Sequence, residues 1–200
     1  MKPECLSYAR NSLEIEQKAI KNVAPCVETS SFAQTVDILS TVPKVITCAS
    51  GSSGIAAKKF AHSLCCIEKS AMFMPPCEAV HGGLGALKQG NALVMVSRGG
   101  ETAELLPIID VCIKKEATLI AVTENTSSYL ARHADIVLPL IIEKESDKYN
   151  MMATSSYIAT IALFDALLAA VMEETDYKRE QFALIHPGGA VGKMFSEEKQ

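Results

Sequence analysis

The sequence lacks a surplus of basic residues. Among its 200 residues, 19 Lys and Arg stand against 23 Asp and Glu, which gives a formal net charge of -4 at pH 7. The sequence pI is correspondingly low, near 5.6. A protein that neutralises a nucleic-acid backbone needs clustered positive charge, and the few Lys-Lys pairs here are scattered. The sequence therefore predicts no nucleic-acid partner.

The sequence also lacks paired cysteine motifs and an export signal. Its seven cysteines are odd in number, and none belongs to a Cys-x-x-Cys pair. Cys48 and Cys112 lie inside apolar or periodic runs, where a thiol packs as a small hydrophobic group. The first residues, Met1-Lys2-Pro3-Glu4, are polar and carry no apolar stretch of the kind that secretion requires. We expect reduced thiols and a cytoplasmic location.

Long apolar stretches are equally scarce. One segment, from Met151 to Met172, is long enough to cross a membrane. Asp165 lies near its middle, and an unpaired aspartate there would cost a lipid-facing helix about 3 kcal/mol. We predict a buried core helix and no membrane partner.

The proportions of hydrophobic and charged residues are those of an ordinary globular protein. Hydrophobic residues make up 48% and charged residues 21% of the sequence, which excludes disordered, collagen-like and disulfide-scaffold proteins. At roughly 150 residues per domain, the length predicts a single domain over residues 1–200.

Five short apolar runs lack polar alternation, which is typical of strands that are covered on both faces. We expect them to form a parallel sheet between layers of helices. The runs are residues 44–48, 71–74, 92–96, 118–122 and 136–138.

The segments between these runs have helical periodicity. We expect a helix over residues 54–64 after a Ser-Gly turn, and another over 103–115 behind an N-cap at Thr102. A helical N-terminal arm of about 40 residues precedes the first strand, and the long helix from Met151 closes the chain. This alternation predicts an open, doubly wound α/β fold, because five strands are too few for an eightfold barrel.

Ligands of such sheets bind beyond the carboxyl ends of the strands, and three loops there combine glycine with hydroxyl side chains. Backbone N–H groups and hydroxyls that precede a helix can converge on an anion, although the same residues are also common in turns. Neither a P-loop ending nor a Gly-x-Gly-x-x-Gly pattern is present, so no nucleotide cofactor is indicated. The loops are Ala49-Ser50-Gly51-Ser52-Ser53-Gly54, Ser97-Arg98-Gly99-Gly100-Glu101-Thr102 and Thr123-Glu124-Asn125-Thr126-Ser127-Ser128.

Six blocks together resemble the sugar isomerase (SIS) domain, and more narrowly the arabinose-5-phosphate isomerases of the KpsF/GutQ type. The similarity runs in order from about residue 30 to residue 195. The blocks are Ser50-Gly51-Ser52-Ser53-Gly54, Glu78-Ala79-Val80-His81-Gly82-Gly83-Leu84-Gly85, Ser97-Arg98-Gly99-Gly100-Glu101-Thr102, Ala153-Thr154-Ser155-Ser156, Asp165-Ala166-Leu167 and His186-Pro187-Gly188-Gly189-Ala190-Val191-Gly192.

The resemblance implies a three-layer α/β/α sandwich on a five-stranded parallel sheet, with flavodoxin-like winding. It implies interconversion of D-ribulose 5-phosphate and D-arabinose 5-phosphate through an enediol, with no cofactor, in a homotetramer whose active sites are shared between subunits. It also associates the chain with KDO biosynthesis, although the residues themselves leave the pathway open. Longer members append a pair of CBS domains, which we expect to be absent here.

Four side chains fall on functional positions of the family: His81, Glu104, Glu145 and His186. Isomerisation needs a base that moves a proton between C1 and C2, and imidazole suits this at neutral pH. We take His186 as the first candidate, with the others assisting ring opening, hydroxyl proton movement and substrate positioning. The expected substrate and phosphate ligands are Ser50, Gly51, Ser52, Ser53, Ser97, Arg98, Gly99, Thr102, Thr154 and Ser155.

Each catalytic candidate also has a purely structural interpretation. Glu104 in the first turn of a helix would stabilise the helix dipole, and Glu145 lies in a polar run typical of a solvated loop. His81 and His186 would each simply end a helix.

The chain departs from the family pattern at several positions. Ser52 stands where the first loop typically has a lysine, so a cation that could neutralise phosphate is missing. Arg98 replaces a small polar residue, and we hypothesise that it supplies the lost charge. Pro75 and Gly83 replace a histidine and an aspartate.

These departures keep other functions open. One is a phosphosugar isomerase for six or seven carbons, and another is a non-catalytic SIS module that binds a sugar phosphate and regulates a partner. We expect no metal site, because no local ligand spacing such as His-x-x-x-His occurs.

Overall fold

The computed structural model describes residues 1–187. Five parallel strands form one sheet in the order β2-β1-β3-β4-β5, as the apolar runs predict. Each strand starts and ends within one or two residues of its run. The strands are β1 (Val45–Cys48), β2 (Ala71–Phe73), β3 (Ala92–Val96), β4 (Thr118–Thr123) and β5 (Ile136–Pro139).

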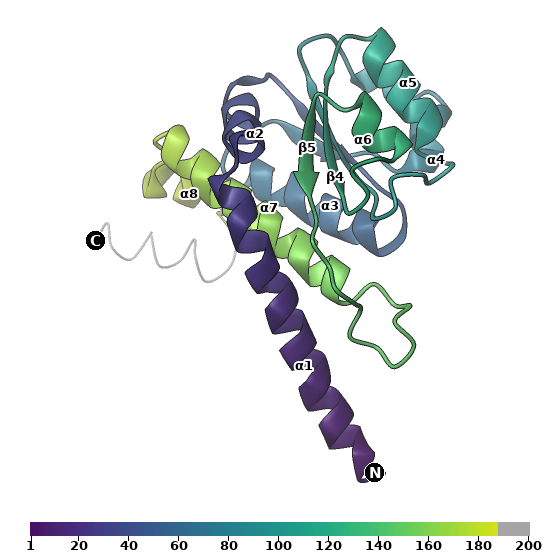
Figure 1. The fold of residues 1–200 in the computed structure, drawn as a ribbon. Helices are drawn as coiled ribbons and strands as arrows, with labels where there is room; N and C mark the ends of the chain where they lie inside the picture. Colours follow the sequence, from purple (N-terminus) through teal and green to yellow (C-terminus); the bar gives the residue numbers. More distant parts are fainter. Residues whose placement is uncertain (188–200) are drawn as a thin grey trace, which may run out of the picture.

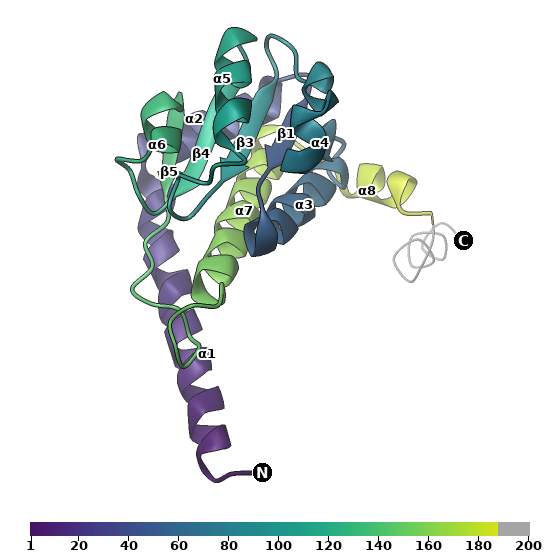
Figure 2. The same cartoon turned by 90° about the vertical axis from the view of Figure 1, so that its right-hand side faces the viewer.

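Helices cover both faces of the sheet, so the prediction of a three-layer α/β/α sandwich is confirmed (Figure 2). One layer contains α1 (Glu4–Val23), α2 (Ser30–Thr41), α3 (Gly51–Cys65) and α7 (Ser155–Glu174), and the other contains α4 (Pro76–Val80), α5 (Leu106–Lys114) and α6 (Tyr129–His133). A short 3-10 helix, Ala24–Glu28, joins α1 to α2, another, Gly83–Ala86, follows α4, and α8 (Arg179–Ile185) follows α7.

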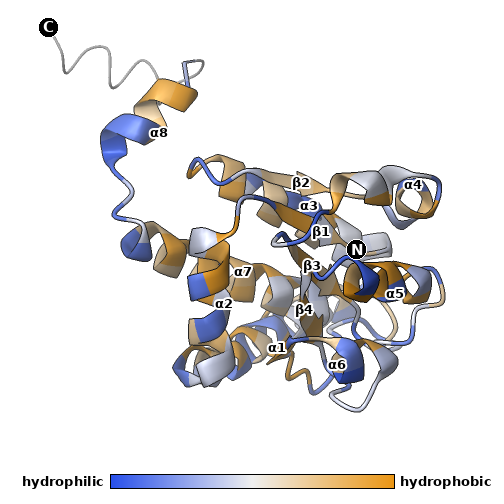
Figure 3. Ribbon diagram, turned by 90° about the horizontal axis from the view of Figure 1, so that it is seen from above, coloured by the Kyte–Doolittle hydropathy of each residue, from blue (hydrophilic) through white to orange (hydrophobic). Residues whose placement is uncertain are grey.

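Two separate hydrophobic cores result from the alternation of side chains along each strand. Val45 and Val94 point into the core beneath α2, α3 and α7. Ile46 and Leu93 point into the core beneath α4, α5 and α6. Figure 3 shows apolar ribbon in the strands and in the helices that cover them, α5 and α7 among them.

Helix α7 is the centre of its layer. It packs against α1, α2 and α3, and Leu163, Phe164 and Leu167 are fully buried. Among residues 1–187 it is the one helix long and apolar enough to span a membrane. Asp165 is paired with Lys59, and the prediction of a core helix is confirmed.

Two predicted helix starts are wrong. Helix α5 begins at Leu106 rather than Ala103, because Pro107 lacks an N–H group and fits only the first turn of a helix. Thr102 is therefore not its N-cap, and its hydroxyl lies 2.9 Å from that of Ser97 instead. Helix α7 begins at Ser155 rather than Met151, since the Asp147 carboxylate accepts backbone N–H bonds that hold residues 149–152 in a loop.

The predicted helical N-terminal arm is present as α1 and α2, whereas α3 is longer than predicted. Helix α1 begins at Glu4 and extends as a rod away from the body of the protein (Figure 1). Helix α3 begins at Gly51 rather than Gly54, which places Ser52 and Ser53 in its first turn. Gly51 has φ +59°, a conformation that strains any residue with a Cβ.

All seven cysteines are free. Cys48 and Cys112 are fully buried, which confirms their expected role as small hydrophobic groups. Burial raises the pKa of each of these two thiols to about 12. They are therefore protonated and unreactive at neutral pH.

Candidate active site

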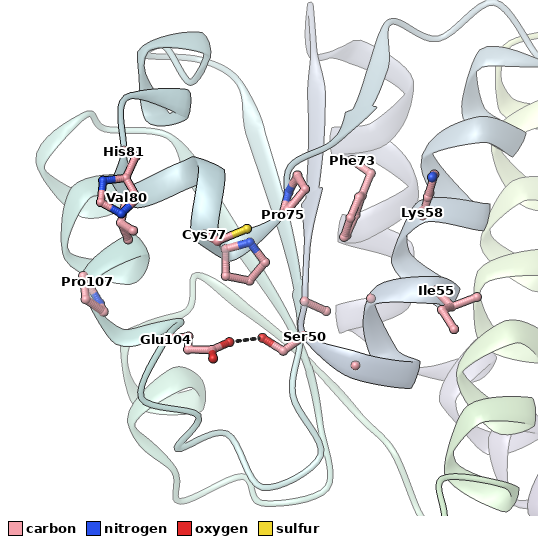
Figure 4. Close-up of a pocket in the computed structure, with 14 residues that line it drawn as sticks. Ser50, Ile55, Lys58, Phe73, Pro75, Cys77, Val80, His81, Glu104 and Pro107 are labelled. Carbon is pink, nitrogen blue, oxygen red and sulfur yellow. Dashed lines mark hydrogen bonds between the residues drawn. The ribbon is translucent and has the colours of Figure 1, made fainter.

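A pocket of about 860 Å³ lies at the carboxyl ends of β1 and β2, between α3 on one side and α4 with the start of α5 on the other (Figure 4). Two of the four predicted catalytic residues, His81 and Glu104, line it together with Ser50 and Gly51. The remaining lining residues are Ala49, Gly54, Ile55, Lys58, Phe73, Pro75, Pro76, Cys77, Val80 and Pro107.

A hydrogen bond joins the loops that follow β1 and β3. The Ser50 hydroxyl donates to Oε2 of Glu104 over 2.7 Å. β1 and β3 are neighbours in the sheet and mark the point where the strand order reverses, which is where doubly wound proteins bind ligands. Glu104 precedes α5 instead of lying in its first turn, so the interpretation of Glu104 as a helix-dipole residue is wrong.

His81 enters the pocket from the end of α4. It is the C-cap residue of that helix, and Gly82 follows it with φ +110°. His81 is exposed, and Figure 4 shows its ring on the same wall as Glu104 and Val80. The structure thus gives His81 both the helix-end position and a place in the pocket.

Glycine in place of the family's aspartate at position 83 has a steric explanation. A Cβ atom at Gly83 would lie 2.7 Å from the carbonyl oxygen of Glu78. Because the close atom belongs to the backbone, any residue with a Cβ at this position would force the loop to shift.

Glu145 is buried rather than solvated, so its interpretation as a loop residue in water is wrong. Its side chain is 1% exposed, and its carboxylate accepts backbone N–H bonds from Thr154 and Ser156 at the start of α7. Burial raises the pKa of Glu145, but the hydrogen bonds from Ser156 and Thr154 and the charge of Arg98 outweigh it, and the pKa lies below its ordinary value. Glu145 is therefore ionised at neutral pH.

Arg98 connects Glu145 to a third loop. Its Nη1 lies 2.9 Å from Oε1 of Glu145, and its Nε lies 2.5 Å from Oε2 of Glu124. Two carboxylates thus share one guanidinium, and the trio carries a net negative charge. Contact between Arg98 and a substrate phosphate stays a prediction.

The predicted phosphate ligands are only partly brought together. Ser50 and Gly51 line the pocket, and Ser52 and Ser53 lie in the adjoining first turn of α3. The other six lie elsewhere, at the two sites described next.

The loop after β3 forms a separate group. The Ser97 and Thr102 hydroxyls are bonded to each other, while Arg98 and Gly99 line a different recess beside Glu124. At the start of α7, Thr154 donates to Glu145. The buried hydroxyl of Ser155 has no hydrogen-bond partner within the described chain.

His186 lies outside the pocket. Its ring stacks on Phe182 with centroids 3.8 Å apart, and its Nδ1 lies 2.8 Å from the carbonyl oxygen of Phe182. Both residues belong to the α8 region, which lies on the opposite side of the molecule from the α4 and α5 walls of the pocket (Figure 3). The rest of its motif, residues 188–192, lies outside the described residues.

Lys58 is a charged pocket residue that the motif analysis missed. Gly51, Gly54, Ile55 and Lys58 all line the pocket from α3, and their spacing places them on one face of that helix. Helical spacing from the glycine loop could have identified it. Within residues 1–187, no cluster of three or more His, Cys, Asp or Glu side chains is arranged to bind a metal ion.

Residues 38–170 match the family described as SIS domain. The chain belongs to the SIS domain family. A "Probable arabinose 5-phosphate isomerase" of Haemophilus influenzae is 33% identical to this SIS protein over 189 residues, which are 94% of this chain and 56% of the relative. The chain thus spans just over half the length of this curated relative.

Two solved structures match almost the whole SIS protein. A "putative sugar-phosphate isomerase" of Listeria monocytogenes is 40% identical, with a TM-score of 0.90 over 94% of this chain and 100% of that one. An Escherichia coli CFT073 protein in complex with arabinose 5-phosphate is 28% identical, with a TM-score of 0.86 over the same shares. Together with the relatives named arabinose 5-phosphate isomerase, they confirm the resemblance on which the site prediction rests.

Proposed function

We propose that this SIS protein is a cofactor-independent phosphosugar isomerase that interconverts D-ribulose 5-phosphate and D-arabinose 5-phosphate. The observation that carries the proposal is the pocket at the point of strand reversal, in which the Ser50–Glu104 hydrogen bond, His81 and the start of α3 meet. The names of the similar proteins support the same class of substrate.

The reaction moves a proton between C1 and C2 of an opened sugar through an enediol. In our proposal, Glu104 and His81 move hydroxyl protons and assist ring opening, because both reach the same cavity from one wall. Ser50 orients the Glu104 carboxylate through its hydrogen bond. Backbone N–H groups at the start of α3 and the hydroxyls around them bind the anionic end of the substrate.

His186 keeps its proposed role as the base for C1 and C2, and this requires a neighbouring subunit. Within one chain it lies away from the pocket, so we propose that His186 enters the pocket of an adjacent copy in a homotetramer. Exposed apolar side chains support such an assembly. Ile55 is 62% exposed and Val80 46% exposed at the pocket, and Leu13 is 69% exposed on α1.

The buried Glu145 takes a supporting part in this proposal. It joins the start of α7 to the loop after β3, which is the loop that leads to Glu104. We also keep the expectations of a cytoplasmic location and of a phosphorylated sugar as the one small-molecule partner, without nucleic acid or membrane.

Incubation with D-ribulose 5-phosphate in heavy water tests the proposal. We expect NMR to detect D-arabinose 5-phosphate that carries solvent deuterium at C2, because the enediol exchanges its proton with the base. Tight binding of the sugar phosphate without exchange would instead identify a regulatory module. Preferred turnover of six- or seven-carbon sugar phosphates in a substrate panel would reassign the specificity.

The volume of the pocket supports the alternative specificity for six- or seven-carbon sugar phosphates. A cavity of about 860 Å³ lies toward the upper end of small-molecule sites, and Pro75 and Phe73 form part of its wall. A longer sugar phosphate fits the same catalytic groups, so only the substrate panel separates the two isomerases.

A further inference from the structure

The carboxylate of Glu145 is surrounded by hydrogen-bond donors. Its Oε1 accepts a hydrogen bond from Nη1 of Arg98 over 2.9 Å. Its Oε2 accepts from the N–H and the hydroxyl of Thr154 and from the N–H of Ser156, at 2.9–3.1 Å. An ionised carboxylate has about four acceptor sites, and these four donors occupy them. The side chain is 1% exposed, so the carboxylate offers no open acceptor site to a ligand.

Glu145 also lies apart from the pocket. The described residues that line the pocket include Ser50, His81 and Glu104, but not Glu145. A group that transfers a proton must come within about 2.6–3.2 Å of the reacting atom, or act through one water molecule. Glu145 would have to break its hydrogen bonds to make such a contact. Its surroundings therefore favour a role that it performs through its neighbours.

Arg98 links Glu145 to the loop that follows β3. Its guanidinium donates to Glu145, and its carbonyl oxygen accepts the hydroxyl of Thr123 and the N–H of Glu124, each over 3.0 Å. Arg98 is therefore fixed at both its side chain and its backbone. The loop, residues 97–104, runs from there to Glu104 at the wall of the pocket. Contacts that hold Arg98 thus also restrain Glu104.

Position 145 requires a carboxylate because each of its partners is a donor. An amide has one acceptor oxygen and one NH2 group. In Glu145→Gln, the NH2 group would face either the guanidinium of Arg98 or the N–H groups at the start of α7, and the donor that it faces would lose its acceptor. If Arg98 loses its acceptor, Glu124 alone holds the guanidinium, and the loop is no longer tied to α7.

We propose that Glu145 is a positioning residue that, together with Arg98, ties the loop of residues 97–104 to the start of α7 and so fixes Glu104 in the pocket, without exchanging a proton with the substrate. The inference rests on the proposed function and deepens it, because it leaves the proton transfers to Glu104 and the histidines. A displacement of about 1 Å at a reacting group can cost about a hundredfold in rate. Loss of this restraint should therefore be measurable as a loss of turnover.

The test is the pH profile of kcat/KM for D-arabinose 5-phosphate in Glu145→Gln, Arg98→Met and the double variant, measured on the full chain at a temperature where circular dichroism shows each variant folded. We expect Glu145→Gln to lower kcat/KM about tenfold or more. The limbs of its pH profile should stay where they are in the wild type, because the groups that titrate during the reaction remain.

The other variants test whether the two residues act as a unit. Arg98→Met breaks the same tie and should lose about as much activity as Glu145→Gln, and the double variant should lose no more than either single variant. Arg98→Lys keeps a charged donor and should recover part of the loss. The matched control, Glu143→Gln, makes the same change at an exposed glutamate of the same loop and should alter kcat/KM less than about twofold.

Loss of one limb of the pH profile in Glu145→Gln, with Arg98→Met near wild type, would overturn the proposal and make Glu145 an acid–base group. Wild-type activity in Glu145→Gln, or additive losses in the double variant, would overturn it as well and leave the isomerase standing. If the wild type binds the sugar phosphate without turnover, the isomerase is refuted. The same variants are then compared by Kd, where equal, non-additive rises keep the tie and an unchanged Kd overturns it. Failure of the wild type to bind would refute both.

Discussion

Replacement of Arg98 by methionine leaves the buried carboxylate of Glu145 without its charged partner. Glu145 is 1% exposed at its side chain, whereas that of Arg98 is 39% exposed. Removing one partner of a fully buried pair costs about 3–5 kcal/mol. Because Arg98 is partly solvated and Glu145 keeps its two backbone N–H bonds, we expect a smaller loss of about 2 kcal/mol in the free energy of unfolding.

Thermal and urea denaturation measure this loss. For a chain of this size, about 2 kcal/mol corresponds to a fall in Tm of about 4–8 °C. The double variant Arg98→Met/Glu145→Gln leaves only the exposed Glu124 carboxylate without its partner and no buried unpaired charge, so it should regain part of the loss. Glu124→Gln removes only the exposed carboxylate that Arg98 contacts and should cost less than about 1 kcal/mol.

The pH dependence of the loss follows from the pKa of Glu145, which is lowered in the folded protein. A lowered folded-state pKa contributes stability above the unfolded value, and this contribution disappears as the pH falls through the folded value. In Arg98→Met the carboxyl can protonate more readily, so the difference from wild type should narrow in acid. A loss that is absent at neutral pH, or unchanged between pH 7 and pH 4, would refute this reasoning.

Three further substitutions test the site. His186→Ala should lower turnover more than about tenfold while His62→Ala, an exposed histidine on α3, leaves it near wild type; a smaller loss removes His186 from the role of base. Glu104→Gln should lower kcat about a hundredfold or more with little change in the affinity for D-arabinose 5-phosphate, and a change confined to affinity would make Glu104 a binding residue. Gly83→Asp, which restores the family residue, should lose about 1–3 kcal/mol in urea denaturation because its Cβ meets the carbonyl of Glu78, and unchanged stability would contradict the close contact.

The sheet was predictable because its signal is local. A run such as Ala92–Val96 is apolar at every position, and its shortness and flanking turns favour a strand buried on both faces over a helix. The starts of α5 and α7 were mispredicted because single residues, rather than the hydrophobic pattern, determine them. Pro107 sets the start of α5 through its missing N–H group, and Asp147 delays α7 by binding three backbone N–H groups.

The candidate site was predictable only where its residues are close in sequence or carried by a motif. Ser50, His81 and Glu104 meet in one pocket as their motifs predict. The burial of Glu145 was not predictable, because Arg98 lies 47 positions away along the chain. The position of His186 depends on how α8 packs, which no motif specifies.

The pocket is bounded by walls that belong to different hydrophobic cores. Helix α3 packs into one core, whereas α4 and α5 pack into the other. A sugar phosphate bound in the pocket would contact α3 on one side and the end of α4 on the other. It would therefore restrain the motion of one helical layer relative to the other. Bound ligand would then protect amide hydrogens in both cores from exchange, well beyond the residues that it touches.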